Sequence, residues 1–209
     1  MQVKTFFIIE DHTITNIGLQ KFIQEKTGAV CLGYAFSKSE AEEKLNLLSS
    51  SNSTNELPDI IILDLYLGNE NGLDLLKVIR EKYPEIKILV YSMYAKPGII
   101  SIALEEGANG FVEKSASETI LISAVKSILA GETFVQQKLI SSIFTYKTVF
   151  DGLTKQEQKI LKLILNQKTK SQISAELNIV PRTVDNYLSR IFDKTGCRGI
   201  KEIFEKFAK

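Results

Sequence analysis

The chain has 209 residues, of which 44% are hydrophobic and 24% are charged, which excludes a fibrous or wholly disordered chain. Its two cysteines lie far apart and it has one histidine, which excludes a disulfide framework, a Cys-based zinc finger and a His-rich metal site. The net charge is +1, but residues 1–150 carry a net −4, whereas residues 151–209, with 12 basic and 7 acidic side chains, carry +5. A basic C-terminal part favours a partner with a phosphate backbone.

The first part of the chain alternates strand-like and helix-like segments. The predicted strands cover residues 3–9, 29–35, 60–63, 86–91 and 110–112, the predicted helices cover 13–26, 38–48, 72–82, 98–106 and 117–130, and a polar loop covers 49–55. Because the strands are continuous apolar runs, both faces of their sheet should be covered. The alternation predicts an α/β fold with a doubly wound, five-stranded parallel sheet.

The pattern changes after residue 130. Residues 131–150 show no clean period and are predicted to be a linker, in part helical. We therefore expect one domain at 1–130 and a second domain at 151–209.

The second domain is predicted to contain four short helices and no strand. Thr154 and Glu157 form a capping box at the start of the first helix, and the third helix begins at Pro181 and stops at Gly196. A short second helix before this longer third one is the spacing of a helix-turn-helix.

The sequence shows no pattern typical of secretion or of a membrane span. Residues 3–9 lack the long apolar stretch and cleavage site of a signal peptide. No uncharged apolar run approaches the roughly 18 residues that a membrane span needs. We therefore expect a cytoplasmic protein.

Polar side chains follow the predicted strands at the ends that parallel strands share. They are Glu10 and Asp11 after the first strand, Asp64 after the third, Ser92 at the end of the fourth and Lys114 after the fifth. These ends form the functional crevice of a doubly wound sheet. Clustered carboxylates need a divalent cation such as Mg²⁺, and a carboxylate can attack phosphorus. Each residue alone would more often be a helix cap or a surface charge, but the combination favours phosphoryl transfer.

Four stretches resemble the receiver domain of two-component response regulators, over roughly residues 1–130. They are Glu10-Asp11-His12, residues 58–64 (PDIIILD), residues 91–94 (YSMY) and residues 107–114 (GANGFVEK). The resemblance implies a flavodoxin-like fold, a bound Mg²⁺ and a histidine kinase as phosphoryl donor. The family's usual proline after the phosphoacceptor is absent, since Leu67-Gly68 stands there, which leaves the rigidity of that loop open.

The resemblance also implies a role for each site residue. Asp64 would be the phosphoacceptor, Asp11 a direct Mg²⁺ ligand and Glu10 a ligand through water. The other roles would fall on the backbone carbonyl of Tyr66 as a further Mg²⁺ ligand, on Ser92 and Lys114 at the phosphoryl group, and on Phe111 as the aromatic switch. His12 is predicted to be a first-turn helix residue without a catalytic role.

The third helix of the C-terminal domain carries polar side chains away from its apolar stripe. These are Arg182, Thr183, Asp185, Asn186, Ser189 and Arg190, and Lys170 lies on the helix before it. A helix fits the major groove, where arginine and asparagine read base edges and lysine binds phosphates. Polar residues at these positions are also the ordinary solvated face of a helix, and this alternative stays open from charge and spacing alone.

The same region resembles the LuxR-type helix-turn-helix, over about residues 151–208. The stretches are residues 153–157 (LTKQE), 173–179 (ISAELNI), 182–187 (RTVDNY) and 194–196 (KTG). Val180 departs from the serine that usually caps the recognition helix, and Asp185 stands where many members carry lysine, so base preference cannot be carried over.

Together the two resemblances imply a transcriptional regulator of the NarL/FixJ subfamily rather than an enzyme. A histidine kinase would phosphorylate Asp64, and a homodimer would bind double-stranded DNA at two-fold related half-sites. One alternative is a phosphorylation-independent DNA-binding dimer whose receiver is a scaffold. Another is an adaptor whose helical domain binds a protein.

Overall fold

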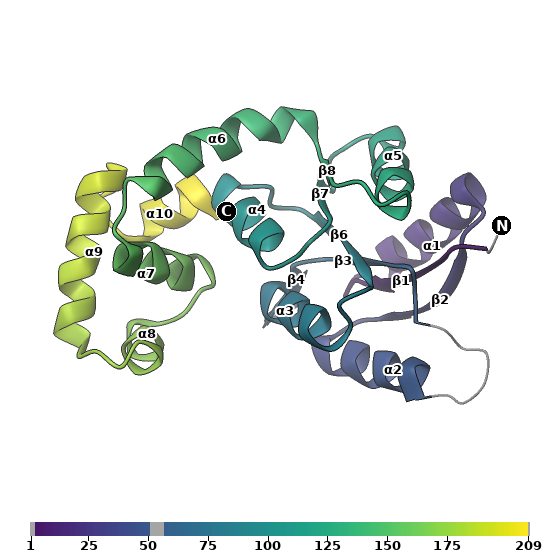
Figure 1. Cartoon of the computed structure of the whole chain (residues 1–209), viewed down its shortest axis with the longest axis horizontal. Coiled ribbons are helices and arrows are strands. Elements are labelled where there is room, and N and C mark those ends of the chain that lie inside the picture. The colour runs from purple at the N-terminus through teal and green to yellow at the C-terminus, as the bar shows by residue number, and fades with distance from the viewer. Residues whose placement is uncertain (1–2, 51–56, 209) are drawn as a thin grey trace. The chain divides into compact units, whose positions relative to one another are not determined.

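The computed structural model describes residues 3–50 and 57–208, which separate into two compact units (Figure 1). The first unit runs up to Met93 and includes Ala103–Gln136, and the second combines Tyr94–Ile102 with the residues from Gln137 onwards. Positions 51–55 of the predicted polar loop lie outside the described residues. Within those ranges, no helix is both long enough and apolar enough to cross a membrane.

A parallel sheet forms the centre of the first unit, with its strands in the order β2-β1-β3-β6-β7-β8. The strands are β1 (Thr5–Ile9), β2 (Val30–Ala35), β3 (Ile60–Leu63), β6 (Lys87–Ser92), β7 (Gly110–Glu113) and β8 (Phe134–Val135). The doubly wound α/β fold is thus confirmed. The sheet differs from the predicted five strands by a sixth, β8. This two-residue strand lies within the predicted linker and extends the sheet because Phe134 packs against the core.

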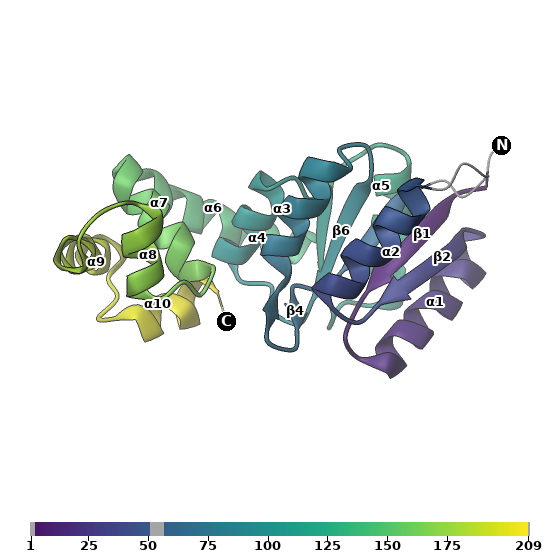
Figure 2. The same ribbon diagram turned by 90° about the horizontal axis from the view of Figure 1, so that it is seen from below.

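Helices cover both faces of this sheet (Figures 1 and 2). The helices in this part of the chain are α1 (Thr13–Thr27) after β1, α2 (Lys38–Ser50) after β2, α3 (Gly72–Lys82) after the segment from β3 to β5, α4 (Pro97–Glu105) after β6 and α5 (Glu118–Leu129) after β7. The first residues of α4, up to Ile102, belong to the second unit. Helices α1 and α5 contact each other and enclose one core with alternate strand residues such as Phe6 and Ile62. Helices α2 and α3 lie on the opposite face. The apolar strand runs are therefore buried from both sides, as their composition predicts.

A short hairpin follows Asp64 in place of an irregular loop. Strands β4 (Tyr66–Leu67) and β5 (Glu70–Asn71) pair antiparallel and leave Gly68 and Asn69 as a two-residue turn. Gly68 has a φ of 62°, which a turn of this type requires at its first position. The side chain of Glu70 accepts a hydrogen bond from the backbone N–H of Lys38 at 2.7 Å, at the start of α2. The loop that lacks the family's proline is therefore held by backbone pairing and by this hydrogen bond, and its rigidity stays an open question.

The second unit is helical. Its helices beyond residue 136 are α6 (Gln137–Asp151), α7 (Lys155–Leu165), α8 (Lys170–Glu176), α9 (Pro181–Thr195) and α10 (Ile200–Phe207). Helix α9, seen end-on in Figure 2, packs on α7 and α8 through buried residues such as Val184, Leu188 and Ile191. The capping box of Thr154 and Glu157 is confirmed. Helix α6 occupies most of the predicted linker, so this segment is more regular than its weak periodicity indicated.

Candidate functional site

Parallel strands place the predicted site residues at one edge of the sheet. Glu10 follows β1, Asp64 follows the neighbouring β3, and the backbone N–H of Asp64 donates to the carbonyl of Ile9 at 2.9 Å. Ser92 ends β6, and its carbonyl accepts a 2.9 Å hydrogen bond from the backbone N–H of Lys114, just beyond β7. Topology alone therefore gathers residues that are more than 100 positions apart in the sequence.

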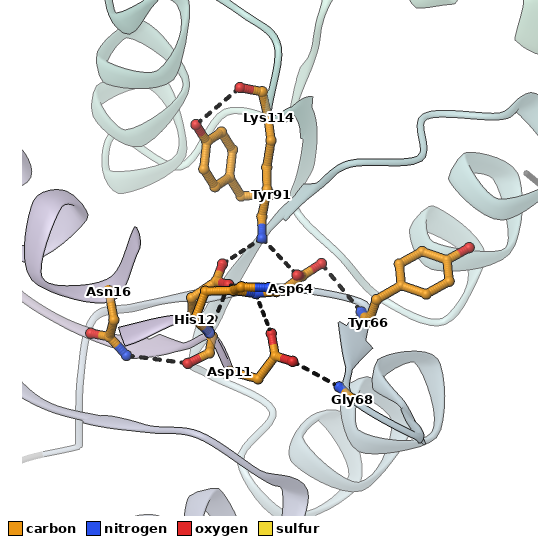
Figure 3. A network of polar contacts seen from close by, with 9 residues as sticks. Asp11, His12, Asn16, Asp64, Tyr66, Gly68, Tyr91 and Lys114 are labelled. Atoms are coloured by element: carbon orange, nitrogen blue, oxygen red, sulfur yellow. Dashed lines mark hydrogen bonds and ion pairs between the residues drawn. The ribbon is translucent and has the colours of Figure 1, made fainter. Parts of the chain in front are cut away.

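Lys114 joins the two buried carboxylates of this site (Figure 3). Its Nζ lies 2.6 Å from Oε2 of Glu10 and 2.7 Å from Oδ2 of Asp64. All three side chains are nearly inaccessible, with exposed fractions of 11%, 2% and 3%. Burial alone would lower the pKa of Lys114, but its contacts with Asp64 and Glu10 outweigh this effect and raise the pKa. Lys114 is therefore a fixed positive charge beside Asp64.

The β4–β5 hairpin contacts both of the aspartates of the site. Oδ1 of Asp64 accepts a hydrogen bond from the backbone N–H of Tyr66 at 3.2 Å. Oδ2 of Asp11 accepts one from the backbone N–H of Gly68 at 2.9 Å. The hairpin thus holds the backbone of Tyr66 next to the carboxylate that the resemblance assigns as phosphoacceptor.

His12 lies closer to the acidic residues than the sequence analysis anticipated. It is the N-cap residue of α1 and precedes the first turn of that helix. Its Nδ1 lies 2.8 Å from Oδ1 of Asp11 and 3.1 Å from Oε1 of Glu10. The negative charge of Asp11, together with the hydrogen bond to Glu10, raises the pKa of His12. Side-chain direction at a helix cap does not follow the helical period, so the sequence carried no signal of this contact.

The donor set of this pocket suits a hard divalent cation. Glu10, Asp11 and Asp64 bring three carboxylates together, while Lys114 supplies one buried ammonium group, which leaves an excess of negative charge. Oxygen ligands and excess negative charge are what Mg²⁺ requires. The fully buried Oγ of Ser92 has no hydrogen-bond partner among the described residues, so it is free to bind an incoming group.

Phe111, the predicted switch residue, is fully buried in β7, where it is in register with Val90 of β6. Its role as the aromatic switch stays a prediction.

Six of the seven predicted DNA-contacting residues lie on α9, and the seventh, Lys170, is the first residue of α8. Arg182, Asp185, Asn186, Ser189 and Arg190 are exposed, and Thr183 is partly exposed, while Val184 and Leu188 face inwards. Their positions match the predicted division of this helix into a polar face and an apolar stripe.

Two ion pairs of the helical unit involve residues that the sequence alone did not connect. Nζ of Lys170, at the start of α8, is paired with Oδ1 of Asp185 on α9. Nζ of Lys194 lies 2.7 Å from Oε2 of the buried Glu157. Each pair joins two helices, and helical periodicity cannot reveal such contacts.

Comparison with known proteins identifies both parts of the chain. A family model of the response regulator receiver domain matches residues 6–126, and a model of bacterial regulatory proteins of the luxR family matches residues 151–206. The transcriptional activator protein ExaE of Pseudomonas putida is 26% identical over 195 residues, which covers 90% of this chain and 87% of the relative. The response regulator UvrY of Escherichia coli (strain K12) is 24% identical, with coverage of 94% and 89%.

A solved structure shares the fold of the chain. RcsB from Salmonella enterica serovar Typhimurium, bound to promoter rprA in the presence of the phosphomimetic BeF3-, matches with a TM-score of 0.71 at 20% identity and covers 100% of both chains. This likeness supports the fold, while the two family models carry the assignment. The chain therefore belongs to the two-component response regulators of the NarL/FixJ type, DNA-binding transcriptional regulators in which a receiver domain is followed by a LuxR-type helix-turn-helix domain.

Proposed function

We propose that Asp64 accepts a phosphoryl group from a histidine kinase and that this modification controls DNA binding by α9. The observation that carries the proposal is the buried Asp64 carboxylate, held 2.7 Å from Lys114 at the edge where Glu10 and Asp11 also lie. A carboxylate in this setting is a positioned nucleophile with its counter-charge in place.

In the proposed reaction, an oxygen of Asp64 forms a bond to phosphorus while the phosphorus–nitrogen bond of the kinase phosphohistidine breaks. Lys114 stays beside the new anion and offsets its charge, and the Ser92 hydroxyl donates a hydrogen bond to a phosphoryl oxygen. Asp11, Asp64 and the carbonyl of Tyr66 would hold Mg²⁺, with Glu10 acting through water. The ion would supply charge neutralisation at the phosphoryl oxygens.

Phosphorylation replaces the carboxylate charge of about −1 on Asp64 with an acyl phosphate of about −1.5 to −2, and this added negative charge biases a two-state element. We propose that Phe111 moves towards the modified site and that the surface of residues 93–130 repacks, which alters dimerisation or frees the DNA-binding domain. The regulator would act as a cytoplasmic homodimer on two-fold related half-sites.

The phosphoacceptor is tested by incubating the protein with acetyl phosphate and Mg²⁺ and measuring its intact mass. The wild type should gain one phosphoryl group and Asp64→Asn should gain none. Asp59→Asn is the matched control, since Asp59 lies at the opposite end of β3 and accepts hydrogen bonds from Thr5 there. Labelling of Asp64→Asn at the wild-type rate would contradict the assignment.

The DNA surface is tested by comparing two variants in a salt titration. Arg182→Ala should lower affinity for the selected sequence by about 1–3 kcal/mol and relax specificity, because arginine reads base edges. Lys170→Ala should weaken all sequences alike and flatten the salt dependence. Equal behaviour of the two variants would contradict these roles.

The beryllofluoride complex of the wild type separates the proposal from its alternative. A change in DNA affinity or oligomer size supports switching by phosphorylation. Unchanged values would instead favour a receiver that acts only as a dimer scaffold.

A further inference from the structure

We propose that His12 is a direct ligand of the divalent ion in the receiver pocket, and that the pocket therefore binds a first-row transition-metal ion such as Mn²⁺ more tightly than Mg²⁺. The inference rests on the proposed function, because it concerns the ion of the same pocket. It adds a nitrogen donor to a site whose other donors are oxygens.

The geometry around His12 is that of a ligand set. Its Nδ1 and carboxylate oxygens of Glu10 and Asp11 all lie within 4.8 Å of one another. Nδ1 lies 2.8 Å from Oδ1 of Asp11 and 3.1 Å from Oε1 of Glu10. Neighbouring ligands on an octahedral ion with bonds of about 2.1 Å are about 3.0 Å apart. The 2.8 Å between Nδ1 of His12 and Oδ1 of Asp11 is therefore already close to the spacing of two neighbouring ligands on one ion, while Glu10 stays a ligand through water.

The direction of the ring supports the same reading. His12 is 70% exposed, so solvent offers its side chain other directions, yet Nδ1 forms a hydrogen bond with Oε1 of Glu10 and lies 2.8 Å from Oδ1 of Asp11 (Figure 3). The carboxylates of Glu10 and Asp11 are 2% and 24% exposed, so the imidazole lies at the open rim of an otherwise buried site. An ion entering from solvent would meet His12 and Asp11 first.

The chemical type of the donor atoms determines which ion binds more tightly when His12 is a ligand. Carboxylate and carbonyl oxygens suit Mg²⁺ and Mn²⁺ alike, whereas an imidazole nitrogen suits transition-metal ions and adds little for Mg²⁺. Removing the imidazole should therefore reduce the affinity for Mn²⁺ and leave the affinity for Mg²⁺ close to unchanged.

The test is pulsed electron paramagnetic resonance of Mn²⁺ bound to the full chain, without a histidine tag. His12 is the only histidine of the sequence, so imidazole nitrogen coupling to the bound ion can come from no other residue. We expect nitrogen modulation in the wild type and its loss in His12→Asn. Asparagine is a favourable N-cap residue, so this variant should keep the start of α1 while removing the imidazole.

Affinities measured on the same two proteins complete the test. The ratio of Mn²⁺ to Mg²⁺ affinity should fall about tenfold or more in His12→Asn, since losing even an outer-shell partner of a metal ligand costs about 10–100-fold in affinity. Tight Mn²⁺ binding without nitrogen modulation, or an unchanged ratio, would overturn the role of His12 and leave the pocket intact. If neither ion binds to the wild type, or if Asp64→Asn binds both ions as well as the wild type does, the metal site of the proposed function fails instead.

Discussion

Both parts of the molecule bury a glutamate against a lysine, yet the two pairs have opposite surroundings. In the receiver part, Glu10 shares Lys114 with Asp64, and Asp11 lies alongside, so negative charge is in excess. In the helical part, Glu157 pairs with Lys194 and its carboxylate also accepts the backbone N–H of its own N-cap residue, Thr154. The second carboxylate has its partners within the fold, whereas the first cluster needs an additional cation. Charge balance therefore distinguishes a site prepared for chemistry from a buried pair that supports folding.

Lys114→Met should have the largest effect on stability, because it removes the lysine that pairs with both Glu10 and Asp64. It leaves Glu10 and Asp64 buried without a counter-charge, and losing one partner of a buried ion pair costs about 3–5 kcal/mol. We expect a loss of this size in the free energy of unfolding in urea, followed by circular dichroism. Added Mg²⁺ should restore part of the lost stability, since it replaces the missing charge. Lys114→Arg, which keeps the charge, is the control, and an unchanged unfolding midpoint in Lys114→Met would contradict the excess of negative charge.

The pair of Glu157 and Lys194 should contribute less to the free energy of unfolding, and its contribution should depend on pH. Burial alone would raise the pKa of Glu157, but hydrogen bonds from Lys194 and Thr154 outweigh it and lower the pKa. Its stabilisation is therefore fully present above the ordinary glutamate value of about 4.3 and is lost as the pH falls through the lowered pKa.

Glu157→Gln measures this contribution directly. The variant should be about 2 kcal/mol less stable near neutral pH, the scale of hydrogen bonds to a charged group. The difference in free energy of unfolding between the wild type and Glu157→Gln should become smaller as the pH falls below about 4.3, because the wild-type glutamate then becomes protonated while glutamine does not titrate in this range. Unfolding curves of both proteins at several pH values provide the measurement. A difference that stays constant into acid would show that the charge of Glu157 does not contribute.

The smallest expected effect concerns the start of α9. Val180 is its N-cap residue, has no side-chain acceptor and is 64% exposed, so little packing is lost on replacement. Val180→Ser should raise stability by about 0.5–1 kcal/mol, because serine can accept a hydrogen bond from the first turn. Thermal unfolding compares this variant with Val180→Ala as control. If the two variants have the same melting temperature, the start of α9 does not limit the stability of the helical part.

The receiver pocket could be predicted from sequence because the topology of a parallel sheet fixes where strand ends meet. Glu10, Asp64 and Lys114 lie at ends of strands with strong apolar patterns, so their convergence follows from the pattern. The polar face of α9 was predictable for the same reason, from a clear helical period.

Other features depend on tertiary contacts that leave little trace in the sequence. The strands of the β4–β5 hairpin have two residues each, which is too short for a recognisable alternation. The pairing of Lys170 with Asp185 joins two helices and depends on how they pack. The contact of His12 with Asp11 depends on a side-chain rotamer, which no period describes.

The β4–β5 hairpin determines where the sequence around this pocket can vary without disturbing the pocket. Its shape depends on backbone pairing and on Gly68, rather than on a proline ring. The exposed tip residue Asn69 can therefore be exchanged among relatives while the backbone amides that meet Asp11 and Asp64 keep their places. We expect natural variation to concentrate at this tip, where new side chains could tune recognition of one kinase over another while the reaction itself stays unaltered.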